Sequence, residues 1–332
     1  MLVLKRQILK QQVSALRKVS YRSVQLLKRN IKHFVFIIIV ALFLFNACDE
    51  KKDSIVISFE HPETGQPFEI VHAYELYRDY FEEISKNQDK NQKELFQNII
   101  MNSVYHACFE GGEYLHLVDS LINNPPEDES AYLNQLKKID KNKLNELIKD
   151  ALIHSSNWLQ TENKNTVCVF PTGNEQTSMV TAGTGKIITY YQDYYTDNMI
   201  KSLIAHEYHH SVWTEKYFSS GNTITVLDNL IFEGKAVAFE KLVYPEGSIV
   251  PPHPYYNMTD WEKIEPDLYK VDLDRSIEII RGGGELPYAY GYSVGNRIVE
   301  LYLEENPNLT PADLLGIRAD VIYEAIEFPT PF

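Results

Sequence analysis

The chain has 332 residues, 44% of them hydrophobic, so it is long and apolar enough for one large domain or two small ones around a substantial core. It contains 46 Asp and Glu against 32 Lys and Arg, and nine of these basic residues precede Cys48, where the chain has no acidic residue. The part after Cys48 is therefore strongly acidic and lacks a basic stripe, which argues against a nucleic-acid partner.

The first 47 residues have the pattern of a bacterial signal peptide. A basic stretch precedes the apolar run Phe34–Phe45, whose twelve residues are too few to cross a hydrocarbon core, which needs about 20. Ala47 and Cys48 follow, and a small residue before a cysteine resembles a lipobox, in which the cysteine is lipidated and becomes the mature N-terminus. We predict a lipoprotein that Cys48 anchors outside the cytoplasm at the bacterial cell membrane. An uncleaved signal anchor and a buried apolar segment are the alternatives.

Residues 48–57 form a short charged tether in this interpretation, and residues 58–165 form a helical N-terminal region. Apolar residues recur three and four positions apart in three segments of that region: Ala73–Ile84, Lys93–Phe109 and Lys141–Leu159. After Cys48 the chain has two further cysteines, Cys108 and Cys168. An oxidising compartment would permit them to pair, but their spacing leaves both a disulfide and two buried thiols open.

The periodicity changes near residue 166, where short segments rich in Val, Ile, Thr and Tyr are bounded by glycine and proline. Thr166–Phe170 is predicted to be a strand, and Met179–Tyr191, with Gly183-Thr184-Gly185 in its middle, a hairpin. The second strand of this hairpin leads toward the next helix. An extended peptide can add to the edge of such a strand by main-chain hydrogen bonds, so this order bears on function.

The rest of the chain is predicted to be helical. The expected helices are Asp197–Phe218, Thr225–Val243, Tyr269–Arg281, Tyr290–Glu305 and one that starts at the cap Thr310-Pro311. A loop rich in proline and aromatic residues follows the second helix from Tyr244 to about Trp261, and Gly282-Gly283-Gly284 forms a flexible connection before the fourth. We assign residues 166–332 to a second domain.

The first of these helices carries the sequence His-Glu-Tyr-His-His at residues 206–210. His206 and His210 are about one turn apart, so both imidazoles can reach a single Zn²⁺ while Glu207 stands beside them. This arrangement suits hydrolysis, because a cation with an open coordination position acidifies water and a carboxylate that does not ligate the metal can take the proton. A solvent-facing histidine cluster is the alternative, but the largely apolar segment Ile200–Ala205 before the motif indicates a helix that runs through a core.

A catalytic zinc ion needs a third protein ligand. A metzincin would have Gly and His at the positions of Trp213 and Lys216, so that class is excluded. The remaining choice is a glutamate on the following helix, and Glu233 lies in a strongly helical context.

The position of Glu233 can be tested by geometry. Ser219–Asn222 is the only cluster of turn residues between His210 and Glu233 and lies midway between them, so two antiparallel helices would bring these side chains level. Asp228 falls about a turn and a half short, and Glu240 lies about two turns beyond on the same face. We therefore predict Glu233 as the third ligand and keep Glu240 as a partner of a ligand.

Three motifs together resemble a known family: His206–His210, Glu-Gly-Lys-Ala at Glu233–Ala236 and Gly-Tyr-Ser-Val-Gly at Gly291–Gly295. They are similar to those of a family of predicted zinc-dependent proteases classed as a domain of unknown function, whose members are bacterial and include lipoproteins. The resemblance covers roughly Lys186–Leu303. It implies a peptidase acting on peptide or protein substrates and, by broader analogy, a gluzincin-like site with two histidines and one glutamate on zinc.

Peptide hydrolysis also needs a donor for the oxyanion that forms when water attacks the carbonyl. Gluzincins often use a Tyr or His outside the metal helices, and Tyr292, just after the glycine-rich connection, is the first candidate, ahead of Tyr290 and His253. His209 lies about 100° round the helix from His210, so we do not expect it to ligate the metal.

The sequence thus predicts an α+β, mainly helical protein, with a zincin-like metallopeptidase domain, a small β-sheet next to the active-site helix and an N-terminal helical extension. Zn²⁺ held by His206, His210 and Glu233 would activate water, and Glu207 would take its proton. Two alternatives remain. One is a non-catalytic lipoprotein in which the same three residues form a structural zinc site. The other is a binding or chaperone-like protein with a vestigial site, which recognises a partner through the loop Pro251–Trp261 and the helical region.

Overall fold

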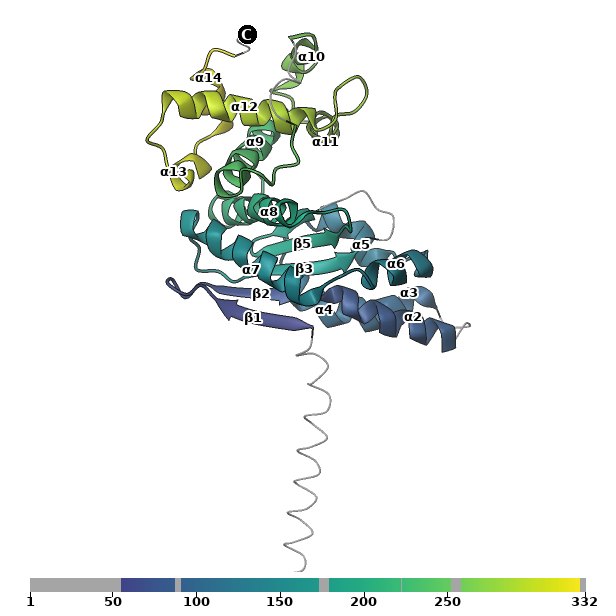
Figure 1. The fold of residues 1–332 in the computed structure, drawn as a ribbon. Helices are drawn as coiled ribbons and strands as arrows, with labels where there is room; N and C mark the ends of the chain where they lie inside the picture. Colours follow the sequence, from purple (N-terminus) through teal and green to yellow (C-terminus); the bar gives the residue numbers. More distant parts are fainter. Residues whose placement is uncertain (1–54, 87–90, 173–178, 222, 252–257, 329–332) are drawn as a thin grey trace, which may run out of the picture. The chain divides into compact units, whose positions relative to one another are not determined.

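The first part of the fold is built on a five-stranded sheet (Figure 1). The computed structural model describes residues 55–328 except 87–90, 173–178, 222 and 252–257. The strands are β1 (Val56–Glu60), β2 (Pro67–Val71), β3 (Asn165–Pro171), β4 (Met179–Gly183) and β5 (Lys186–Tyr191). They lie in the order β1-β2-β3-β5-β4. The pairs β1/β2 and β4/β5 are antiparallel, whereas β3 runs parallel to both β2 and β5.

The two ends of this sheet differ from its middle. Every residue of β3 is buried, as expected for a central strand covered on both faces. Among the described residues, β4 has one neighbouring strand, β5, and therefore forms an edge of the sheet. The predicted strand at Thr166–Phe170 is confirmed as β3, and the predicted hairpin at Met179–Tyr191 is confirmed as β4 and β5. Gly183 and Gly185, both with positive φ, allow the tight connection between these two strands.

The prediction that the chain is helical from residue 58 to residue 165 was wrong for its first part, because β1 and β2 lie there. β2 pairs in parallel with β3, from Phe68 with Asn165 to Val71 with Cys168. The chain on either side of residue 166 therefore shares one sheet, and Ile55–Phe332 forms one compact unit. A five-residue strand whose partner lies almost a hundred residues away leaves little trace in local periodicity.

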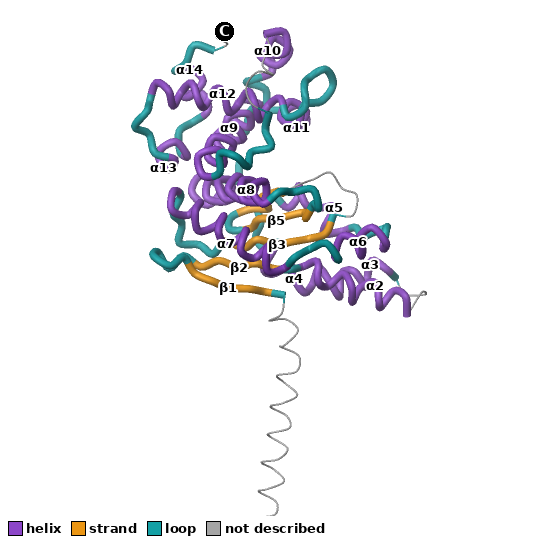
Figure 2. Tube along the Cα trace, viewed as in Figure 1, coloured by secondary structure: helices purple, strands orange, loops and turns teal. Residues whose placement is uncertain are grey.

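The three helical segments expected between residues 73 and 159 are confirmed, with some division into shorter pieces (Figure 2). The elements are η1 (Ala73–Glu75), α2 (Leu76–Lys86), α3 (Gln92–Phe96), η2 (Gln97–Met101), α4 (Asn102–Cys108), η3 (Leu115–Val118), α5 (Asp119–Asn123), α6 (Glu129–Leu136) and α7 (Lys141–Trp158). Cys108 at the end of α4 forms a disulfide with Cys168 of β3, with Cα atoms 5.9 Å apart. The question of their pairing, open in the sequence, is thus answered by the fold.

Helices follow β5, as expected, although the helix Met258–Ile264 begins within the predicted loop and the helix predicted at Tyr269–Arg281 begins only at Leu273. They are α8 (Asp197–Tyr217), α9 (Val226–Val243), α10 (Met258–Ile264), η5 (Glu265–Asp267), α11 (Leu273–Arg281), α12 (Tyr290–Glu305), α13 (Pro311–Leu315) and α14 (Ala319–Glu324). The predicted cap at Thr310 is present, since its side chain and that of Asp313 bond to each other's backbone N–H in a capping box. The prediction of an α+β, mainly helical chain is confirmed at this level.

Two hydrophobic cores meet at the pair of helices α8 and α9. The first core lies around the sheet and the helices before α9, and the second is formed by α9 together with the helices from α10 to α14. α8 packs against β4 and against α9, and α9 packs against α12 (Figure 1). No helix in the described ranges is both long and apolar enough to cross a lipid bilayer. The predicted signal peptide, Cys48 and most of the tether lie outside the described residues, as does His253.

Candidate metal centre

The helix α8 carries three candidate site residues into the protein interior. Its N-cap Thr196 accepts a hydrogen bond from Met199 N, which satisfies one of the free N–H groups of the first turn. Packing on both sides leaves His206, Glu207 and His210 only 6, 7 and 5% exposed. Polar side chains buried to this extent need specific partners, and α9 supplies several of them.

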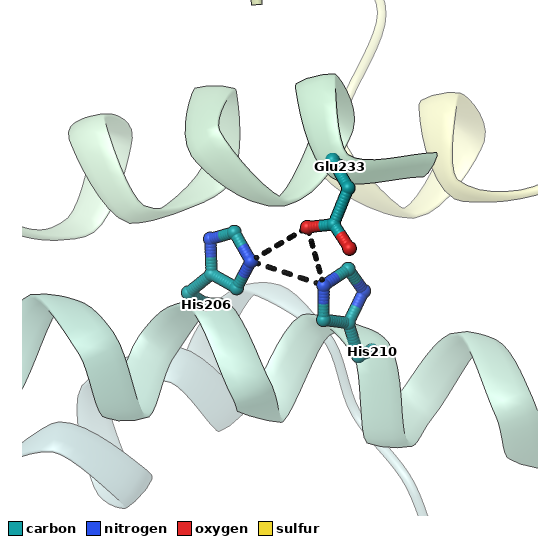
Figure 3. A group of neighbouring side chains, drawn as sticks. All are labelled: His206, His210 and Glu233. Atoms are coloured by element: carbon teal, nitrogen blue, oxygen red, sulfur yellow. Dashed lines mark hydrogen bonds and ion pairs between the residues drawn. The ribbon is translucent and has the colours of Figure 1, made fainter. Parts of the chain in front are cut away.

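The start of α9 is fixed by a second capping box, in which the side chains of Thr225 and Asp228 bond to each other's backbone N–H. Asp228 is therefore used at the helix end and not at the site. Glu233 lies further along α9 and faces the two histidines (Figure 3). The prediction that the chain reverses so that His210 and Glu233 face each other is confirmed.

Three potential ligand atoms form a nearly equilateral triangle. Glu233 Oε2 lies 3.1 Å from His206 Nε2 and 3.1 Å from His210 Nε2, and the two Nε2 atoms are 3.0 Å apart (Figure 3). A tetrahedral zinc ion with ligands at about 2.0–2.1 Å separates them by about 3.3 Å, so this triangle matches one face of such a site. Two imidazole nitrogens and one carboxylate oxygen are also a donor set that zinc favours. The residues thus fit a zinc ion.

His206 is oriented from its other ring nitrogen. Glu240, 1% exposed, places Oε2 2.9 Å from His206 Nδ1, and its other oxygen accepts a hydrogen bond from Ser248 Oγ. A carboxylate at Nδ1 keeps the proton there and directs the Nε2 lone pair toward the metal position. Burial lowers the pKa of His206, but its hydrogen bonds to Glu233 and Glu240 outweigh burial and raise the pKa well above the ordinary value, so zinc binding would have to displace the proton on Nε2.

Glu233 is held ionised by the same cluster. Burial raises the pKa of its carboxyl, but the charge of His210 and the hydrogen bonds from both histidines outweigh burial and hold the pKa well below its usual range. A deprotonated carboxylate is the form that coordinates a cation.

His210 is held by ring stacking. Phe232 lies almost parallel to it, with ring centroids 4.1 Å apart and an interplanar angle of 21°. Trp213 in turn packs edge-on against Phe232 with centroids 4.9 Å apart. Within the described part of the chain, His210 Nδ1 has no hydrogen-bond partner. The orientation of this ring therefore depends on aromatic contacts from α9 and from its own helix.

Tyr292 reaches the centre because α9 and α12 cross with their backbones in contact. A Cβ atom on Gly234 would lie 2.2 Å from the carbonyl carbon of Gly295, and one on Gly295 would lie 2.2 Å from Leu230 O. The Tyr292 ring centroid is 6.0 Å from that of His206. Burial raises the pKa of Tyr292 far above its ordinary value, and the charges of Glu233 and Glu207 raise it further, so the phenol stays neutral.

Tyr290, the second candidate for the oxyanion donor, and His209, which was not expected to bind the metal, are both buried outside the group of three ligand atoms. Tyr290 is 1% exposed and belongs to the second hydrophobic core. His209 is 2% exposed and packs against Phe239 and His210, with ring centroids 5.7 Å away in both cases. Burial lowers the pKa of His209 well below its ordinary value, so its imidazole is neutral. His209 is not part of the group of three ligand atoms, in line with the prediction.

Several residues around the centre were missed by the sequence analysis. Thr181 on β4 places Oγ1 2.8 Å from Glu207 Oε2, and Ser248 and Phe232 hold Glu240 and His210 in the ways described above. Phe232 could have been suspected, because it directly precedes Glu233. Nothing in the sequence indicates which residue of the predicted hairpin faces Glu207.

Comparison with known families gives one match over more than half of the chain. Residues 144–324, from α7 to α14, match the model of a family described as "Predicted Zn-dependent protease (DUF2268)". A search of curated proteins and a search of solved structures found no match. The matched region contains His206, Glu207, His210, Glu233 and Tyr292. The chain therefore belongs to the family of predicted Zn-dependent proteases.

Proposed function

We propose that this protein is a zinc-dependent peptidase of the gluzincin type with a zincin-like domain, in which His206, His210 and Glu233 hold the metal ion. The observation that carries the proposal is the triangle of three ligand atoms, with sides of 3.0 and 3.1 Å. Family membership supports zinc dependence and a peptide or protein substrate.

The composition of the cluster favours catalysis over a purely structural metal site. A closed structural zinc site has four protein ligands, whereas a catalytic site keeps one position open for water. Among the described residues, the cluster of potential ligands has three members. Glu207 is a neighbour of the cluster and not one of its members, as a general base requires.

The roles of the residues follow from their placement. Zinc bound here would lower the pKa of a water molecule and polarise the substrate carbonyl. Glu207, buried beside the metal ligands, accepts the proton of the attacking water and returns it to the leaving amine. Tyr292 keeps its proton because of its raised pKa, so it can donate a hydrogen bond to the carbonyl oxygen as negative charge develops there.

The edge strand β4 is the proposed place for the substrate backbone. β4 lies at the end of the sheet order and packs against α8, the helix that carries Glu207. An extended peptide can add to such an edge through main-chain hydrogen bonds. The backbone oxygen of Ala182 already has a partner within the chain, because it accepts a hydrogen bond of 2.9 Å from Tyr114 N. The peptide would therefore pair with the part of β4 before Ala182.

Substitution of Glu207 tests the reaction. We expect Glu207→Gln to keep one equivalent of zinc by elemental analysis and to lower cleavage of a peptide library by about 10²–10⁴-fold, the usual contribution of a general base. Tyr292→Phe should lower kcat with zinc still bound. Glu305→Gln, which changes an exposed acid at the end of α12, is the matched control and should cleave like the wild type. Full activity of zinc-loaded Glu207→Gln would rule out the assigned base.

We also propose that the protein is a lipoprotein anchored through Cys48 outside the cytoplasm. The Cys108–Cys168 disulfide supports this location, because structural disulfides persist in oxidising compartments. Metabolic labelling with a radioactive fatty acid, followed by membrane fractionation, tests the anchor. The wild type should be labelled and sediment with membranes, and Cys48→Ala should be unlabelled. An unlabelled wild type would exclude lipidation.

A further inference from the structure

The side chain of Thr181 reaches from the sheet to the general base on α8. Thr181 is 4% exposed, and its Oγ1 lies 2.8 Å from Glu207 Oε2 and 2.8 Å from the backbone oxygen of Glu207. A hydroxyl group has one hydrogen to donate, and an ionised carboxylate is a stronger acceptor than a carbonyl oxygen. The hydroxyl of Thr181 therefore donates to the Glu207 carboxylate when that carboxylate is charged.

The position of Thr181 is fixed by an irregularity in the strand. The pairing of β4 with β5 shifts between Thr181 and Gly183, which leaves Ala182 as the extra residue of a β-bulge. Bulges of this kind redirect neighbouring side chains. The bulge is itself held in place, because the Ala182 carbonyl accepts from Tyr114 N and the Glu113 carboxylate accepts from both Thr184 N and Thr184 Oγ1. Thr181 therefore approaches Glu207 from a rigid support.

A carboxylate next to a metal centre can take either of two positions. Glu207 directly follows His206 on α8 and could swing toward the cation as a fourth ligand, which would close the position needed for water. A hydrogen bond to Oε2 from outside the ligand cluster opposes this rotation. Oε1 takes no part in this hydrogen bond and stays available to accept a proton.

We propose that Thr181 is a positioning residue, whose hydroxyl holds the Glu207 carboxylate beside the metal ligands and keeps it from joining them. The proposal rests on the proposed peptidase function for its kinetic consequences but concerns a contact that can be observed without catalysis. The bulged end of β4 thus has a role in the reaction. Through Thr181, the strand proposed to bind the substrate is also in contact with the base, Glu207.

Kinetics of two Thr181 variants give the first test. Thr181→Val keeps the shape and removes the donor, so kcat should fall about 10–100-fold with KM and zinc content unchanged, as expected for a misplaced base. Thr181→Ser keeps the hydroxyl and should recover most of this loss. Thr189→Val on β5 is the matched control, because Thr189 is 2% exposed and its Oγ1 has no hydrogen-bond partner among the described residues. It should leave kcat unchanged.

Crystal structures of the zinc-loaded wild type, Thr181→Val and Thr181→Ser give a second test that needs no activity. We expect Glu207 in the position described here in the wild type and in Thr181→Ser, and a rotated or ligating Glu207 in Thr181→Val. An unmoved Glu207 in Thr181→Val would overturn the proposal, as would an unchanged kcat or an equal loss in Thr181→Ser. A wild type that cleaves no peptide would refute the peptidase function, and the position of Glu207 in the three structures would still decide the role of Thr181.

Discussion

The two histidines of the metal centre are held by different forces. His206 has a charge-assisted hydrogen bond to Glu240, whereas His210 stacks on Phe232. A hydrogen bond to a carboxylate fixes both the direction of the ring and the nitrogen that carries the proton, and it raises the basicity of the other nitrogen. Stacking fixes the plane of the ring but does not by itself select the nitrogen that carries the proton. The orientation of the His206 ring should therefore depend on one partner, Glu240, more than the orientation of the His210 ring depends on Phe232.

Removing the charge of Glu240 should weaken metal binding without abolishing it. In Glu240→Gln a neutral amide replaces the carboxylate that lies 2.9 Å from His206 Nδ1. The dissociation constant for zinc should rise about 10–100-fold, the usual effect of losing such a partner. Competition with a chromophoric chelator measures this constant, and Glu300→Gln on α12 is a control that should bind zinc like the wild type. Unchanged affinity in Glu240→Gln would contradict the role given to Glu240.

A buried histidine outside the candidate metal-binding group predicts how stability depends on pH. His72 is 0% exposed, and its Nε2 lies 2.8 Å from Asn145 Oδ1. Burial, with a smaller effect of the Lys141 charge, lowers the pKa of His72 from 6.5 to about 4. Because the unfolded chain binds this proton more readily, the contribution of His72 to stability is complete above pH 6.5 and is lost as the pH falls toward 4.

The loss amounts to about 3 kcal/mol at pH 4. Urea unfolding at pH 7 and pH 4 should show that the wild type loses about this much more free energy of unfolding than His72→Gln does over the same interval. Each protein is compared with itself, so a general effect of the substitution on stability cancels. Equal losses in the two proteins would show that His72 titrates normally in the folded state.

At the scale of elements, the crossing of α9 and α12 connects two of the family motifs. Gly234 follows the candidate ligand Glu233, Gly295 closes the segment that contains Tyr292, and the two glycines meet at the crossing. Without side chains there, the helices approach closely enough to bring Tyr292 next to His206. Gly234 and Gly295 are thus explained by packing and not by backbone freedom.

Adding a methyl group at this crossing should separate the two helices. In Gly234→Ala the new Cβ would lie 2.2 Å from Gly295 C, so the free energy of unfolding should fall by about 1–3 kcal/mol despite the better helix propensity of alanine. Activity should fall as well, because Tyr292 moves with α12. Gly283→Ala is the control, since its Cβ would meet only Glu278, with a nearest approach of 3.1 Å to the flexible Cγ. Thermal unfolding and kcat of both variants check the prediction, and an undisturbed Gly234→Ala would refute it.

The helices of the chain were predicted well from sequence, and the sheet only in part. α8, α9 and α12 have strong periodicity and clear ends, such as the capping box at Thr225, so local signals sufficed. β1 and β2 have five residues each, and β2 is stabilised by pairing with β3, which follows it only after nine intervening helical elements. Periodicity within a window of a dozen residues carries no information about such a partner.

At the scale of the whole molecule, the Cys108–Cys168 disulfide ties the helices before β3 to the centre of the sheet. It closes a loop with a sequence separation of 60, and cross-links of this size restrict the unfolded chain. Reduction, or the double variant Cys108→Ser with Cys168→Ser, should lower the free energy of unfolding by about 2–4 kcal/mol. Thermal scans with and without reductant measure the effect. The double variant should be insensitive to reductant, and a wild type that is equally insensitive would show that the bond contributes no stability.

The sequence by itself determined which residues form the candidate metal-binding pair, the proposed base and the third candidate ligand. His206, Glu207 and His210 lie within one helix, where spacing sets direction, and Glu233 follows from the equal lengths of chain on either side of a turn. These properties are local in the sequence, and the side chains of His206, His210 and Glu233 converge in the structure as predicted.

Only the tertiary structure decided what surrounds these residues. The contacts of Glu240 with Ser248, of Thr181 with Glu207 and of Cys108 with Cys168 join different elements, and whether two side chains meet across elements depends on how those elements pack. A close crossing, a bulge or a strand register adjusts such contacts by a few ångströms, and local sequence patterns do not record distances of that kind.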